Sequence, residues 1–256
     1  MTSLALEIAV TGPAGARAAR AGGADRVELC TGLELGGLTP SGPAVAATAA
    51  TGLPVQALIR CRPGDFVYDE EEIGLMTAEI RAVVAAGAAG VVVGALTAEG
   101  ELDADAMRRF AAAAREAGAE AGRPVELTLH RAVDQSADPV RAAGRLPALG
   151  VDRVLTSGGA PTALAGAGTL ARIVRAAPGV QVMAGAGVAP EQAPALAATG
   201  VAALHLSAKR RAPARRTGGW VPLGAGTAEA EEDTHFVTDQ ALVRATRTAL
   251  DALRSR

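Results

Sequence analysis

The chain of 256 residues is long enough for one large domain or two small ones. Hydrophobic residues make up 49% of it but aromatic residues only 2%, so its core must consist of Ala, Val, Leu and Ile packed against its 31 glycines. This composition is typical of helices around a parallel sheet and excludes an aromatic-rich β-sandwich. The formal charge of −2, with both signs spread along the chain, gives no basic face and so excludes a nucleic-acid partner.

The first residues, Met1–Glu7, have neither a basic start nor a long apolar segment, and no uncharged apolar run reaches about eighteen residues. We therefore expect a cytoplasmic protein that has no membrane partner. Cys30 and Cys61 are too few for a disulfide framework in a chain of this length, so we expect two free thiols.

Short runs of strand-like composition recur along the chain, and Ala-rich helical segments separate them. The expected strands are Ala5–Ala9, Arg26–Cys30, Val55–Arg60, Gly90–Ala95, Val125–His130, Asp152–Ser157, Val180–Ala184 and Ala202–Leu206. The clearest helices are Pro43–Ala50, Glu70–Ala86, Ala104–Ala119, Asp138–Leu149 and Asp239–Leu253. Eight such units predict an α/β fold, a single (β/α)8 TIM-like barrel over residues 1–256, in preference to an open doubly wound sheet of about five or six strands.

The stretch 210–234 departs from this rhythm, because it is rich in Gly, Pro and Arg and carries an acidic run. We expect a long surface loop there, before the last helix. The neighbouring basic residues Lys209–Arg211 belong to the same solvated loop in this interpretation.

Alternation along the strands predicts which side chains face the inside of the barrel. Leu6 and Ile8 are expected to pack against helices, which turns Glu7 inward. The same parity applies to all inward candidates, namely Glu7, Ala9, Glu28, Cys30, Gln56, Leu58, Arg60, Glu126, Thr128, His130, His205 and Ser207. A barrel interior is normally filled by branched apolar side chains, so this interior is unusually polar.

Buried carboxylates need donors, and arginines and histidines at the strand ends are the candidates. Glu7 and Glu126 lie low or midway on their strands, where they serve either as ion pairs that fix the register or in function. The side chains near the carboxyl ends are the better candidates for a site, because such barrels keep their sites at that face: Glu28, Arg60, His130 and His205.

Two glycine-rich turns follow late strands. They are Thr156-Ser157-Gly158-Gly159 and Ala184-Gly185-Ala186-Gly187. Such turns expose backbone amides to an anion, although glycines also serve tight turns without any ligand.

Several motifs, in order along most of the chain, resemble the CutC family of copper homeostasis proteins. They are Gly22–Cys30, Gly36–Ser41, Ile59–Tyr68, Gly94–Thr97, His130–Ala132, Arg153–Gly159, Met183–Gly187 and His205–Ala208. The resemblance implies a TIM-like barrel in the cytosol, a homo-oligomer such as a dimer or tetramer, and a role in copper handling through Cu(I) binding.

The chain departs from the family pattern at two positions. Ala9 stands where family members commonly have a cysteine, and Cys61 stands in a motif that usually has no thiol. Cu(I) prefers two or three thiolate or thioether ligands. The copper hypothesis therefore depends on Cys30 as the main ligand, with Cys61 as a second metal ligand and His205, His130 or Met183 as substitutes.

The residues themselves favour an alternative, an enzyme that acts on a small anionic or phosphorylated metabolite. Glu28 or His130 would serve as the acid or base, with Arg60 as a further catalytic group and with Arg60 and Arg62 as anion clamps. The full set expected to bind the anion is Arg60, Arg62, Arg131, Thr156, Ser157, Gly158, Gly185, Gly187, His205 and Ser207.

A third interpretation is an oligomeric binding module. Phe66 and Tyr68 follow the third strand, and Trp220 lies in the late loop. Aromatic residues in loops often serve as interface anchors or lids.

Overall fold

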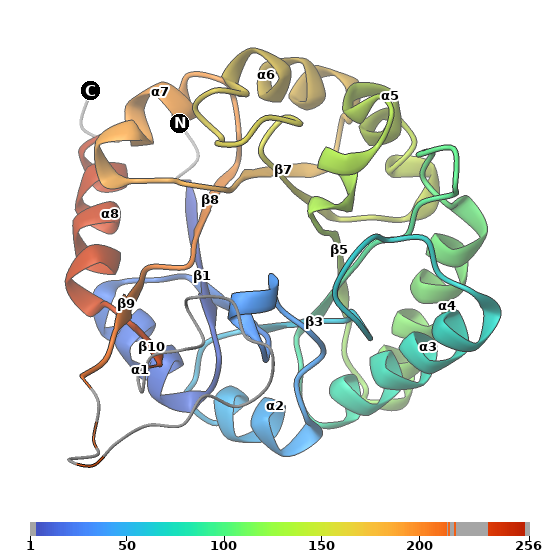
Figure 1. The fold of residues 1–256 in the computed structure, drawn as a ribbon, viewed down its shortest axis with the longest axis horizontal. Coiled ribbons are helices and arrows are strands. Elements are labelled where there is room, and N and C mark those ends of the chain that lie inside the picture. The colour runs from blue at the N-terminus through green and yellow to red at the C-terminus, as the bar shows by residue number, and fades with distance from the viewer. Residues whose placement is uncertain (1–3, 214, 216–217, 219–234, 254–256) are drawn as a thin grey trace.

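The computed structural model describes residues 4–213, 215, 218 and 235–253. Its centre is a closed parallel barrel in which each strand pairs with the next in sequence and β8 pairs with β1 (Figure 1). The strands are β1 (Ala5–Val10), β2 (Arg26–Leu29), β3 (Val55–Leu58), β4 (Gly90–Val93), β5 (Glu126–Leu129), β6 (Arg153–Thr156), β7 (Gln181–Ala184) and β8 (Ala203–Leu206). The predicted (β/α)8 barrel is confirmed.

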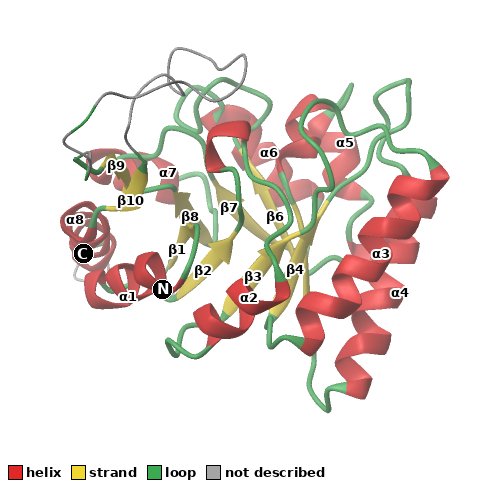
Figure 2. Ribbon diagram, turned by 60° about the horizontal axis from the view of Figure 1, so that its bottom comes forward, coloured by secondary structure: helices red, strands yellow, loops and turns green. Residues whose placement is uncertain are grey.

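The helices pack around the outside of the strands (Figure 2). They are α1 (Pro13–Gly22), α2 (Gly42–Ala49), α3 (Glu70–Ala85), α4 (Ala104–Glu120), α5 (Pro139–Gly144), α6 (Ala167–Ala176), α7 (Ala193–Ala197) and α8 (Gln240–Ala252). None of the described helices is long and apolar enough to cross a membrane.

One predicted helix is shorter than expected. The segment Asp138–Leu149 forms α5 only as far as Gly144, and a 3₁₀ turn follows at Pro147–Leu149. Pro147 has no amide hydrogen to donate and disfavours helical backbone at the residue before it, so the helix cannot continue through this point.

The segment predicted as a surface loop before the last helix begins with a strand. Lys209–Arg211 forms a strand, β9, which pairs antiparallel with β10 (Phe236–Thr238). The Lys209 ammonium and the Arg211 guanidinium lie 4.0 and 5.4 Å from the centre of the Phe236 ring, and this cation–π contact accounts for an ordered basic strand. Most of the rest of 210–234, including Trp220, lies outside the described residues.

The main core lies between the strands and the helices, and it confirms the predicted alternation. The outward-facing side chains of the strands are fully or nearly fully buried there, among them Leu6, Ile8, Val27, Leu29, Leu127, Leu129, Leu204 and Leu206. Burial of this apolar surface stabilises the fold by roughly 25 cal/mol per Å².

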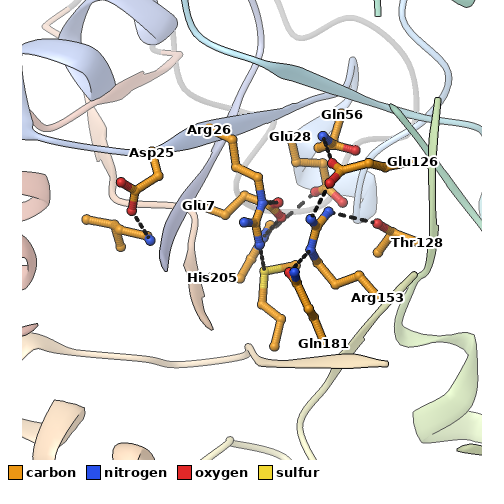
Figure 3. Close-up of polar contacts among 12 residues, drawn as sticks. Glu7, Asp25, Arg26, Glu28, Gln56, Glu126, Thr128, Arg153, Gln181 and His205 are labelled. Carbon is orange, nitrogen blue, oxygen red and sulfur yellow. Dashed lines mark hydrogen bonds and ion pairs between the residues drawn. The ribbon is translucent and has the colours of Figure 1, made fainter. Parts of the chain in front are cut away.

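Two ion-paired groups occupy the inside of the barrel (Figure 3). Arg26 Nε lies 2.5 Å from Glu7 Oε2, and these two residues are also register partners on β1 and β2. Arg153 donates to Glu126 at 3.1 Å, and Gln56 donates to the other oxygen of the same carboxylate at 2.8 Å. Glu7 therefore has the partner that its burial demands, and Glu126, whose side chain is 46% exposed, is the partner of the buried Arg153.

We expect Arg26→Met to destabilise the protein by about 3 kcal/mol, because it removes the cationic partner of a carboxylate that is 1% exposed. Urea unfolding followed by circular dichroism measures this change. Arg141→Met is the matched control, since the Arg141–Glu101 pair is largely exposed and is worth less than about 1 kcal/mol. Equal losses in the two variants would contradict the assignment.

Candidate functional site

A cavity of about 470 Å³ opens among the carboxyl ends of the barrel strands. This volume suits a small molecule. Seven of the predicted site residues line it, from five strand ends: Glu28, Arg60, His130, Arg131, Gly187, His205 and Ser207. Phe66, which the sequence also allowed as an interface anchor or lid, is part of the same wall.

The remaining predicted residues are not part of this lining: Arg62, Thr156, Ser157, Gly158, Gly185, Cys30 and Cys61. Arg62 forms ion pairs with Glu72 and Asp65 and lies over the Tyr68 ring. Its guanidinium is therefore occupied in holding the loop after β3 and is not part of an anion clamp at the cavity.

The first glycine-rich turn is filled by a carboxylate of the chain itself. Asp134 accepts hydrogen bonds from the Thr156 hydroxyl at 2.6 Å and from the amides of Ser157 and Gly159, each at 3.0 Å. Arg131 pairs with the same carboxylate at 2.8 Å. The amides that were predicted to bind an external anion thus bind an internal one. The sequence carried no signal for Asp134, which lies in a 3₁₀ turn more than twenty positions away.

The second glycine-rich turn is open. Ala186 and Gly187 have positive φ values of 82° and 61°, which turn successive amides toward one side. Among the described residues, the amides of Ala186, Gly187 and Val188 have no hydrogen-bond partner. All three residues line the cavity, and Lys209 lines it as well. This side of the cavity therefore offers unused donors and a positive charge.

His205 bridges two carboxylates at the bottom of the cavity (Figure 3). Its Nδ1 lies 2.8 Å from Glu7 Oε1, and its Nε2 lies 3.7 Å from Glu28 Oε2. Arg26 pairs with the far side of Glu7. The four side chains form one line of charges, Arg26–Glu7–His205–Glu28, and its last member faces the cavity.

The pKa values of the two carboxyl groups in this line shift in opposite directions. Burial opposes ionisation of Glu7, but the hydrogen bond to His205 and the charge of Arg26 outweigh it and lower the Glu7 pKa to about 2. For Glu28, burial and the nearby Glu7 charge prevail over the attraction of His205 and raise the pKa to about 7. Burial disfavours the charged form of His205, yet Glu28 and Glu7 raise its pKa overall. Glu28 is thus able to gain and lose a proton near neutral pH.

Arg60 holds the loops around the cavity together. Its guanidinium donates to the carbonyls of Leu35, Gly37 and Gly64 at 2.9, 3.1 and 3.0 Å. It also lies 5.2 Å from the centre of the Phe66 ring. Arg60 therefore brings a buried positive charge to the site, but most of its donors are already used.

The two cysteines do not fit a Cu(I) site with two thiolates. Cys30 lies inside the barrel in an apolar cluster with Leu58 and Val92, whereas Cys61 packs against the outer core. Burial, then the charges of Glu28 and Glu34, raise the Cys30 pKa to about 12, while metal binding requires the thiolate. No group of three or more His, Cys, Asp and Glu side chains in the described residues is arranged to hold a metal ion.

Comparison with known proteins identifies the CutC family. The CutC family model matches residues 4–210. A family protein CutC of Xylella fastidiosa is 47% identical over 219 residues, or 84% of this chain and 79% of the relative. One of Sinorhizobium medicae is 42% identical over 99% of this chain and 98% of its own. The solved structure of CutC from Streptococcus agalactiae, with 26% identity, superposes with a TM-score of 0.71 over 80% of this chain and 98% of that one.

We expect the stability of Glu28→Gln relative to the parent to depend on pH. The raised pKa of Glu28 means that the folded state holds this proton more tightly than the unfolded chain. Its contribution is therefore present at low pH and is lost as pH rises from about 4.5 through about 7, by about 3 kcal/mol in total. The variant lacks this loss, so its free energy of unfolding relative to that of the parent should rise between pH 5 and pH 9.

Urea unfolding at pH 5 and pH 9 measures the change, with Glu116→Gln at an exposed ion pair as the control. A stability difference between parent and Glu28→Gln that is the same at both pH values would contradict a raised Glu28 pKa.

Proposed function

The chain belongs to the CutC family, and we propose that it is an enzyme that performs acid–base chemistry on a small anionic substrate at the carboxyl face of its barrel. The observation that carries this proposal is the position of Glu28. This carboxyl faces a cavity of small-molecule size, is 7% exposed, and has a pKa raised to about 7. A group with such a pKa serves as acid and as base at physiological pH.

The Arg26–Glu7–His205 line supports the same role. His205 Nδ1 is held by Glu7, which leaves Nε2 facing Glu28. The hydrogen bond fixes the orientation of the ring, as an orienting carboxylate does beside an acid–base histidine. Protons that Glu28 takes from a substrate can be shared with His205, which spreads the charge over two groups.

The anionic character of the substrate follows from the positive residues and unused amides that line the cavity. Lys209, whose ammonium contacts the Phe236 ring, lines the cavity together with Ala186, Gly187 and Val188, whose amides have no partner among the described residues. Phosphate sites of such barrels commonly lie after the seventh and eighth strands. Arg60 adds positive charge to the lining, so the cavity favours an anion over a cation.

Two measurements together test this proposal. A thermal-shift screen uses three-carbon to six-carbon sugar phosphates, hydroxy acids and inorganic phosphate, and proton NMR follows turnover of each compound. A compound present at 100 times its Kd should stabilise the parent by about 2.7 kcal/mol. Lys209→Ala should lose most of that shift, and Glu28→Gln should keep the shift but lose turnover at least about 100-fold.

Glu79→Gln is the matched control, because Glu79 is a half-buried carboxyl that lines a separate cavity between α2 and α3. It should behave as the parent does. The proposal fails if no compound stabilises the parent, or if Glu28→Gln turns over substrate at the parent rate.

Copper handling is the second candidate function, and membership of the CutC family is the observation that favours it. The buried, protonated Cys30 and its apolar neighbours argue against tight Cu(I) binding there. We therefore expect the parent and Cys30→Ala to bind Cu(I) equally weakly in an anaerobic competition titration against a chelator of known affinity. Stoichiometric, tight binding that disappears in Cys30→Ala would replace the enzymatic proposal by the copper function.

A further inference from the structure

His130 directly follows β5, and one nitrogen of its ring accepts a hydrogen bond. The backbone amide of Ala132 donates to His130 Nδ1 at 3.1 Å. A neutral imidazole has one acceptor nitrogen and one donor nitrogen. Because an N–H occupies Nδ1 as an acceptor, the ring hydrogen must be on Nε2, and His130 Nε2 is a donor.

The ring is held in place from several sides. A side chain at position 94 would bring its Cβ within 2.5 Å of His130 Cε1, so Gly94 provides the space in which the ring lies. Phe66 packs against the ring with 4.9 Å between centroids. Burial and the charge of Arg60 lower the His130 pKa to about 3, which keeps the imidazole neutral at physiological pH.

The donor on this ring is unused. His130 is 4% exposed and lines the cavity, and its buried Nε2 has no hydrogen-bond partner among the described residues. A buried donor without a partner costs about 1 to 3 kcal/mol. An acceptor oxygen on a bound molecule would remove this cost, so Nε2 has the properties of a ligand contact.

Glu28 lies on β2, and β3 and β4 separate it from β5, which His130 directly follows. Figure 1 shows β1, the neighbour of β2, and β5 on different sides of the barrel axis. A molecule in the cavity therefore meets a proton-accepting carboxylate and a neutral hydrogen-bond donor from two directions. This is the pair of groups that proton abstraction beside a carbonyl requires.

We propose that the substrate is a small anionic carbonyl compound, and that His130 donates its Nε2 hydrogen to the carbonyl oxygen while Glu28 removes a proton from the adjacent carbon. This inference rests on the proposed function and specifies its substrate class. His130 then acts as a hydrogen-bond donor and not as the acid or base that the sequence suggested.

The step balances without a further reactant. The C–H bond breaks and its proton passes to the Glu28 carboxylate. The electron pair of that bond forms a carbon–carbon double bond, and the carbonyl π pair moves to the oxygen that Nε2–H holds. If the proton on Glu28 first exchanges with solvent, its return to the same carbon leaves that carbon labelled. In a hydroxy carbonyl compound, the hydroxyl on the deprotonated carbon can instead pass its proton to the former carbonyl oxygen, and return of the Glu28 proton to the former carbonyl carbon then completes an isomerisation.

The experiment is exchange in D₂O, followed by proton NMR and mass spectrometry. The probes are dihydroxyacetone phosphate, ribose 5-phosphate and 2-oxo acids of three to six carbons, with glycerol 3-phosphate as a compound that has no carbonyl. We expect the parent to catalyse exchange of deuterium for hydrogen on the carbon beside the carbonyl of at least one probe. His130→Met should lower kcat about 100-fold or more, as loss of one such donor does, and His130→Gln, which keeps an N–H, should restore part of it.

A second measurement does not depend on the substrate or on the variants. In ¹⁵N NMR of the labelled parent, His130 should show a protonated Nε2 and an unprotonated Nδ1 from pH 5 to pH 9. A hydrogen on Nδ1, or titration of the ring within this range, overturns the inference even if His130→Met fails to fold.

The outcomes separate this inference from the proposed function. If anions bind and are converted with dependence on Glu28, but no probe exchanges its carbon-bound hydrogen, the carbonyl substrate is wrong and the acid–base function stands. If exchange occurs equally in the parent and His130→Met, the role of His130 is wrong. If no anion binds, the proposed function fails and this inference fails with it.

Discussion

The burial of Glu7 inside the barrel is the constraint on which the site depends. A carboxylate that is 1% exposed must have positive partners, and Arg26 and His205 supply them from the strands on either side of β1. Once His205 is tied to Glu7 in this way, its other nitrogen faces Glu28. Burial is the main cause of the raised Glu28 pKa, His205 opposes it, and the charge of Glu7 adds to it. The internal ion pair thus joins β1 to β2 and fixes the ring of His205 beside Glu28.

The two sides of the cavity differ because the amides of one glycine-rich turn are already hydrogen-bonded, whereas those of Ala186 and Gly187 in the other have no partner in the described part of the chain. Asp134 satisfies the turn after β6, so that side holds an internal anion paired with Arg131. The turn after β7 has no such carboxylate among the described residues, and Lys209 lies next to it. A substrate with one anionic end would therefore be oriented in the cavity, because of the two turns only the one after β7 offers amides without a partner among the described residues.

Much of the site could be predicted from local patterns, and the part that could not depends on contacts between distant segments. Period-2 alternation was enough to place Glu28, His130 and His205 inside the barrel, and all three line the cavity. The chemistry of arginine suggested Arg62 as an anion contact and the glycine-rich turn suggested Ser157, but Arg62 pairs with Glu72 and Ser157 with Asp134. Local patterns of this kind indicate the direction or the chemistry of a side chain, but they do not identify the distant residue with which it pairs in the folded protein.

The sequence by itself determined the barrel, its family and the polarity of its interior. Those properties follow from periodicity, glycine placement and ordered motifs, which act over a few residues or survive as a pattern along the chain. Only the tertiary structure decided the protonation chemistry. The raised pKa of Glu28, the lowered pKa of Glu7 and the hydrogen on His130 Nε2 come from burial and from neighbours on other elements. Electrostatic energy depends on distance and on exposure to water, and both exist only once the strands have closed.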